Sequence, residues 1–131
     1  MLFHIFENQA ERRAFGGGDF IEFQVCRLKP GTPLEEILSG EWPDHWEDDS
    51  LYLCGDDWPE FTVIYGEILT GGTYGNLEQG PLDWCGINYF TPEQEQVILA
   101  RLETEQPPEY GTLLDWFRRG GVHNGFYVLG L

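Results

Sequence analysis

The stretch Phe20-Ile21-Glu22-Phe23-Gln24-Val25, which opens the longer run Phe20–Leu28, decides the kind of fold to expect from this sequence. Its side chains alternate: Ile21, Phe23 and Val25 fall on one side of an extended chain, and Glu22 and Gln24 fall on the other. A period of two residues is typical of a β-strand that has one face against a core. The pattern therefore predicts a sheet with one apolar and one polar face.

Four further strands are expected around this one, at Met1–Phe6, Leu51–Cys54, Phe61–Leu69 and Gly125–Leu131. The turn-forming run Gly55-Asp56-Asp57-Trp58-Pro59 predicts a hairpin between the second and third of them. Thr70–Pro81 is rich in residues that adopt positive φ, and it is predicted to be a loop.

Helix-start signals occur in the second half of the chain. Thr91-Pro92-Glu93-Gln94 combines a hydroxyl N-cap, a proline at the first helical position and a capping-box glutamine, and it predicts a helix to about Glu105. A second helix is expected to begin at Thr112 and to bury Trp116, and a short one is expected at Leu34–Leu38. These elements predict one globular α+β domain over residues 1–131, with a mainly antiparallel sheet and helices packed on one side.

The distribution of charge is the strongest functional signal. Between Gly31 and Ala100 there are fifteen acidic residues and no lysine or arginine, and the formal net charge of the whole chain is −16. Ten of the fifteen lie within Glu35–Glu60, where tryptophans and a tyrosine are interleaved with them. Carboxylates steer the approach of a basic molecule and large aromatic rings supply contact area. The segment therefore predicts a surface that binds a basic protein.

The residues predicted to bind this partner share an acidic and aromatic neighbourhood. They are Glu41, Trp42, Asp44, His45, Trp46, Glu47, Asp48, Asp49, Asp56, Asp57, Trp58 and Glu60. Two less specific interpretations stay open: a solvated acidic loop held by buried tryptophans, and a charge that reflects a halophilic habitat.

Composition excludes several classes of partner and compartment. Only seven lysines and arginines are present, so binding of nucleic acid or of an anionic membrane through phosphates is not expected. The N-terminus lacks a basic segment followed by a long apolar run, which predicts a cytoplasmic protein. Cys26, Cys54 and Cys85 are odd in number and widely spaced, so free thiols are expected.

The sequence also contains residue types found in catalytic and metal sites. The ligand types of a hard-cation or zinc site occur at Asp44, His45, Glu47, Asp48, Asp49, Asp56 and Asp57. Their spacing does not fit an EF-hand, and no metal or cofactor is predicted. Cys54 or Cys85 with His45 or His123 could form a nucleophile–base pair, and two carboxylates could cleave a glycoside, yet no catalytic motif accompanies them. The sequence therefore favours a protein that is not an enzyme.

Three segments of the C-terminal third, Asn88–Gln94, Leu113–Trp116 and Gly125–Gly130, resemble the small immunity proteins of bacterial polymorphic-toxin systems. This resemblance implies a cytoplasmic antidote that binds its cognate toxin, frequently a basic nuclease, and blocks the active cleft. It transfers no functional residues, because such families recognise their toxins through variable surface positions.

The leading hypothesis is thus a non-enzymatic immunity or inhibitor protein whose carboxylates stand in for nucleic-acid phosphates. Two alternatives remain: a nucleic-acid mimic that inhibits other DNA- or RNA-binding proteins, and a small carbohydrate-active or metal-dependent enzyme.

Overall fold

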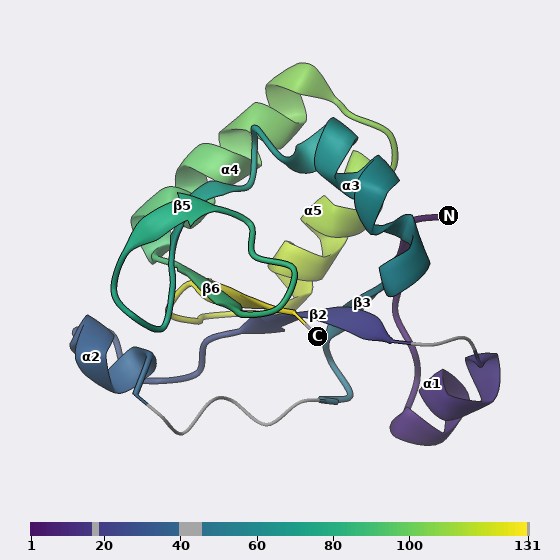
Figure 1. Ribbon diagram of the computed structural model, residues 1–131, viewed down its shortest axis with the longest axis horizontal. Coiled ribbons are helices and arrows are strands. Elements are labelled where there is room, and N and C mark those ends of the chain that lie inside the picture. Colours follow the sequence, from purple (N-terminus) through teal and green to yellow (C-terminus); the bar gives the residue numbers. More distant parts are fainter. Residues whose placement is uncertain (17–18, 40–45, 131) are drawn as a thin grey trace.

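The computed structural model describes residues 1–16, 19–39 and 46–130, which form an α+β fold with seven strands in one sheet and five α-helices (Figure 1). In chain order the elements are β1 (Phe3–His4), α1 (Gln9–Phe15), β2 (Phe20–Val25), α2 (Leu34–Ile37), β3 (Leu51–Cys54), the 3-10 helix η1 (Gly55–Asp57), α3 (Trp58–Tyr65), β4 (Thr70–Thr73), β5 (Gln79–Pro81), β6 (Ile87–Phe90), α4 (Pro92–Glu105), α5 (Tyr110–Arg119) and β7 (Phe126–Leu129).

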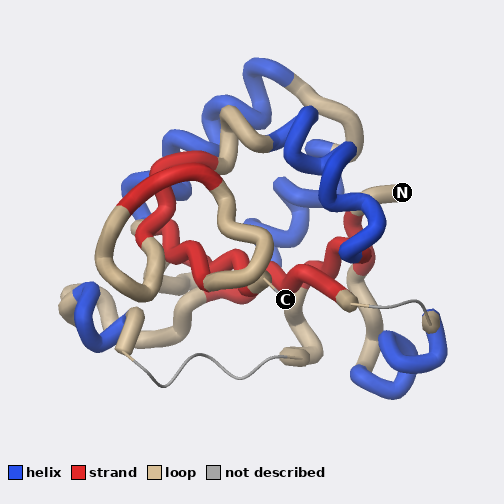
Figure 2. Tube along the Cα trace, in the orientation of Figure 1, coloured by secondary structure: helices blue, strands red, loops and turns tan. Residues whose placement is uncertain are grey.

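The strands are ordered β1-β3-β2-β7-β6-β4-β5, and each pair of neighbours is antiparallel. The alternating stretch Phe20–Val25 is β2, an inner strand between β3 and β7. As expected, Ile21, Phe23 and Val25 enter the main core. The three longest helices, α3, α4 and α5, cover this face of the sheet, as Figures 1 and 2 show.

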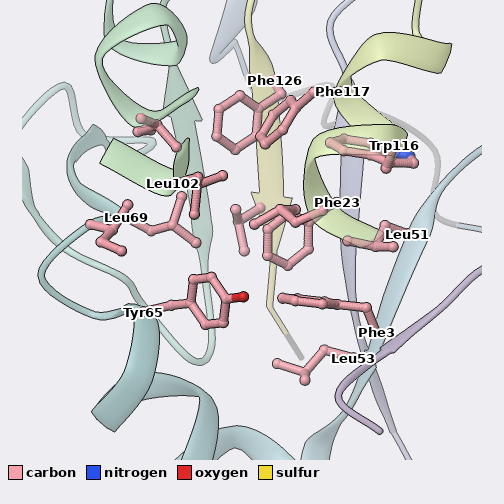
Figure 3. Close-up of a cluster of buried hydrophobic side chains, with 14 of the residues drawn as sticks. Phe3, Phe23, Leu51, Leu53, Tyr65, Leu69, Leu102, Trp116, Phe117 and Phe126 are labelled. Carbon is pink, nitrogen blue, oxygen red and sulfur yellow. The ribbon is translucent and has the colours of Figure 1, made fainter. Parts of the chain in front are cut away.

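Aromatic side chains fill the core between the sheet and these helices (Figure 3). The ring of Phe23 meets those of Phe3 and Trp116 edge to face, with centroids 6.1 Å apart in both pairs. Edge-to-face contacts are a favourable geometry for aromatic rings. Trp116 is 2% exposed, which confirms its predicted core position on the buried stripe of α5.

The opposite face of the sheet is also largely covered. Two smaller clusters lie there: one joins Ile37 and Leu38 to Tyr127 on β7, and the other is built around Tyr52 on β3. The short helices α1 and α2 lie on this side (Figure 1). Glu22, predicted for the polar face, is consequently buried rather than solvated.

The helix-start predictions are confirmed with one shift. Thr91 caps α4 and forms a capping box with Gln94, through bonds of 3.2 and 2.9 Å. The next helix begins at Tyr110 instead of Thr112, after a residue in the left-handed conformation. The hydroxyl of Thr112 therefore lies inside the first turn and is not the cap.

Three predictions in the middle of the chain were wrong. Phe61–Leu69 is not a strand, because Trp58–Tyr65 forms α3, and no hairpin spans Gly55–Pro59. Phe61 and Tyr65 are buried while Val63 is 86% exposed, which fits a helical spacing of four residues and not an alternation of two. The predicted loop Thr70–Pro81 contains β4 and β5, with an irregular register next to Gly71 at φ 84°. Neither α1 nor β6 was predicted.

Candidate functional site

The predicted partner-binding residues fall into two segments on either side of β3. We refer to Trp46–Asp49 as the acidic loop and to Asp56–Glu60 as the acidic turn. All four side chains of the acidic loop are exposed, whereas the acidic turn mixes exposed and half-buried residues. Glu41, Trp42, Asp44 and His45, which complete the predicted set, lie outside the described residues.

The acidic loop is held by the buried side chain of Glu22 on β2. One carboxylate oxygen accepts the backbone N–H of Trp46 at 2.9 Å, and the other accepts that of Glu47 at 3.0 Å and the hydroxyl of Ser50 at 2.7 Å. Gln24 donates to the same group at 2.9 Å. A buried acidic side chain needs such donors to offset its lost hydration. The backbone of the loop is therefore fixed from beneath while its acidic side chains face solvent.

Trp46 contacts both Tyr52 and Arg12 and is still partly exposed. Its ring stacks on Tyr52, with centroids 6.1 Å apart and an interplanar angle of 20°. The guanidinium of Arg12 lies 4.0 Å from the centre of the Trp46 ring, a cation–π contact. The ring is still 40% exposed. A partly exposed ring in the acidic loop thus already binds one guanidinium group.

Tyr52 connects the sheet to the acidic loop. Its hydroxyl donates to the backbone carbonyl of Glu47 at 2.7 Å. Burial raises the pKa of Tyr52 to about 12, an effect that the nearby carboxylate of Glu22 reinforces. The hydroxyl therefore keeps its proton, and its hydrogen bond to the loop, throughout the neutral pH range.

Asp48 and Asp49 connect the acidic loop to neighbouring parts of the fold. Asp48 accepts a bond of 3.3 Å from Gln9 on α1. Asp49 pairs with Arg27, and both side chains are more than half exposed, so the pair adds little to stability. The indole N–H of Trp116 donates to the backbone carbonyl of Asp49 at 2.8 Å. The core and the acidic loop are thereby joined directly.

Two surface hollows flank the acidic loop. One has a volume of about 480 Å³ and is lined in part by Phe6, Glu7, Asp48 and Trp116. The other, of about 440 Å³, includes Glu36 and Glu47 in its lining. Asp49 borders both. Both hollows thus border the acidic loop, and carboxylates line each of them.

The acidic turn is organised differently. Asp56 and Glu60 are exposed, but Trp58 packs against the main core, with ring centroids 5.7 Å from Phe61 and 5.6 Å from Trp84. Trp58 therefore lies on the helical side of the sheet. The Tyr52 side chain under Trp46 points to the opposite side, since Leu51 and Leu53 on either side of it enter the main core. The structure thus separates the two tryptophans that the sequence placed together.

The nucleophile–base pairs that include His45 lie outside the described residues, and in the other pairs His123 has different partners. The ring of His123 is nearly buried and lies 2.8 Å from a carboxylate oxygen of Glu95 and 2.8 Å from the carbonyl of Gly121. Burial raises the pKa of Glu95, and His123 partly offsets this effect. Both ring nitrogens are engaged, which does not suit a general base. Cys54 instead lies beside His4.

Sequence reasoning missed Glu22, Arg12 and His4 as members of these sites. Glu22 and the groups that it binds are far apart in the chain, and the alternation around it indicated only a polar face.

Comparisons with known protein families, with curated proteins and with solved structures found no match to the chain. Among the helices within the described residues, none has the length and apolar character needed to cross a bilayer.

Proposed function

We propose that this chain is a non-enzymatic inhibitor that binds a basic protein through the acidic loop, and that it acts in the cytoplasm as the immunity protein of a cognate toxin. The observation that carries the proposal is the fixation of the acidic loop by Glu22, which presents Glu47, Asp48 and Asp49 to solvent on a preset backbone. A preset loop loses little conformational freedom on binding, so more of the contact energy remains as affinity.

Charge supports the same conclusion. The chain carries a net charge of −16, and its field favours the approach of a cationic surface. Two arginines of the chain, Arg12 and Arg27, already contact Trp46 and Asp49. These contacts are of the kind that arginine or lysine side chains of a partner would make in their place. The exposed Arg27–Asp49 pair is weak, so exchange costs little.

The test is binding of the purified chain to the protein encoded by the neighbouring gene, together with rescue of cells that express that protein. The variant Glu47→Gln/Asp48→Asn/Asp49→Asn should associate about tenfold more slowly at low salt, with a smaller change in dissociation. In concentrated salt the difference should shrink, because surface charges are then screened.

The matched control is Glu67→Gln/Glu78→Gln/Glu93→Gln, which removes the same charge from exposed residues outside the acidic loop. If steering depends on the loop, this control should associate nearly as fast as the parent. Equal slowing by the two variants would reduce the proposal to a general charge effect. Absence of binding and of rescue would overturn it.

A further inference from the structure

Three side chains of the types that bind metal ions converge at the end of β3, away from the acidic loop. They belong to His4, Cys54 and Asp57, each half-buried, and one ligand atom from each lies within 4.8 Å of the other two. The residues come from β1, β3 and η1, and about fifty positions separate the histidine from the other two in the sequence. Only the folded sheet brings them together.

Strand pairing explains how His4 and Cys54 meet. His4 lies opposite Tyr52 in the antiparallel pair β1–β3, so His4 and Cys54 are diagonal neighbours on the same face of the sheet. The preceding residue, Phe3, faces the opposite way into the main core. The register of β1 therefore fixes the direction of the imidazole.

The surroundings hold the histidine in place. The His4 ring stacks on Phe6, with an interplanar angle of 3°, and meets Phe15 of α1 at 4.8 Å between centroids. Apolar walls of this kind restrict water and limit the rotation of a ligand ring. An imidazole fixed by neighbouring rings loses less freedom when it binds an ion.

The side chain of Asp57 does not cap the helix that follows it. It is the N-cap residue of α3, a position where an aspartate normally accepts a backbone N–H, yet it makes no such bond. The Asp57 carboxylate lies beside the other two donors instead.

The geometry points to a Zn²⁺ site formed by His4, Cys54 and Asp57, with a fourth position open to water or to a donor from another molecule. One nitrogen, one sulfur and one carboxylate oxygen are zinc ligands, whereas calcium and magnesium take oxygen alone. Donor atoms of a tetrahedral zinc site lie roughly 3.5 Å apart, so side-chain shifts of about 1 Å would close the site. This inference does not depend on the proposed inhibitor function.

The test uses Co²⁺ as a spectroscopic substitute for zinc, in a Cys85→Ser background that removes the exposed thiol. Titration of the reduced protein should give one bound Co²⁺ per chain with a sulfur-to-cobalt charge-transfer band, and Zn²⁺ should abolish that band by displacing the cobalt. Zn²⁺ should also raise the melting temperature. Failure to observe the band would overturn the assignment.

Two substitutions locate the ion. Cys54→Ser should eliminate the band and the thermal shift by zinc. Asp57→Asn should keep the band but weaken binding by about tenfold or more. The matched control is Asp56→Asn, which removes the same charge one residue earlier in the same turn and should leave affinity almost unchanged. Equal weakening by both asparagine variants would show general attraction to carboxylates and would overturn the site. Circular dichroism of each variant establishes that it is folded.

Discussion

The acidic loop and the acidic turn each contain one tryptophan, one glutamate and two aspartates, to which the turn adds Pro59, and the fold uses them in opposite ways. In the acidic loop, Glu22 binds the backbone from beneath, and the side chains of Trp46 and its acidic neighbours face solvent. In the acidic turn, the chain enters α3 at once, and Trp58 packs into the edge of the main core. Local sequence therefore does not decide whether a tryptophan among carboxylates is exposed or packs against the core.

The largest effect is expected when the side chain that holds the acidic loop, Glu22, is removed. Glu22→Ala leaves the N–H groups of Trp46 and Glu47 and the hydroxyl of Ser50 without their buried acceptor. We expect a loss of about 3–5 kcal/mol in the free energy of unfolding, measured by urea denaturation. Amide hydrogen exchange should accelerate at Trp46 and Glu47 in particular.

Glu22→Gln is the milder variant, because it retains one side-chain oxygen as an acceptor. It should lose less stability than Glu22→Ala does. Amide hydrogen exchange at Trp46 and Glu47 should still accelerate, but by less than in the alanine variant. Unchanged exchange at Trp46 in both variants would contradict the role given to Glu22.

A second experiment replaces each of the two tryptophans, Trp46 and Trp58, by alanine. Trp58→Ala should lower the free energy of unfolding by about 2–3 kcal/mol, below the range for fully buried tryptophans because Trp58 is half-buried. Trp46→Ala should cost less than about 1.5 kcal/mol in stability but about 2 kcal/mol in affinity for the basic partner. Urea denaturation and titration calorimetry on the same two proteins supply both quantities. The reverse ranking would move the contact surface to the acidic turn.

The sequence predicted features that depend on neighbouring residues. The apolar side of β2, the capping box at Thr91 and the buried stripe that contains Trp116 are each encoded within a few positions, and all three are confirmed. The polar side predicted for β2 was wrong, because every residue of that strand is buried. Phe61–Tyr65 was misassigned because apolar residues at every second position also satisfy a spacing of four. There the proline after Trp58, at the start of α3, was the better signal.

The candidate sites depend on pairings that no local pattern contains. The carboxylate of Glu22 accepts the backbone N–H of Glu47, which lies 25 positions later in the chain. His4 comes close to Cys54 only because β1 pairs with β3 in a particular register. A sequence pattern can indicate that a residue is polar or a potential ligand. Which residues become its neighbours depends on the order and register of the strands, and local sequence does not contain that information.

The smallest effect is expected from the pH dependence of the acidic loop. The unfolded chain loses the Tyr52 proton near pH 10, whereas the folded chain keeps it up to about pH 12, mainly because the phenol is buried. Between these values the folded state binds more protons, so the contribution of Tyr52 is complete below pH 10 and is lost as the pH rises through 12. Burial raises the pKa of Tyr65, Tyr89 and Tyr127 as well, and these groups act in the same direction.

Tyr52→Phe isolates the share that belongs to the acidic loop. Below pH 10 the variant should differ from the parent by a nearly constant amount of about 1 kcal/mol, the value of the lost bond to the Glu47 carbonyl. Above pH 10 its stability should fall less steeply, by at most about 1.4 kcal/mol per pH unit, because one fewer proton is linked to folding. Urea denaturation at a series of pH values measures both quantities. Parallel curves above pH 10 would mean that Tyr52 ionises with the loop still in place, and the loop would then be held by Glu22 without help from the phenol.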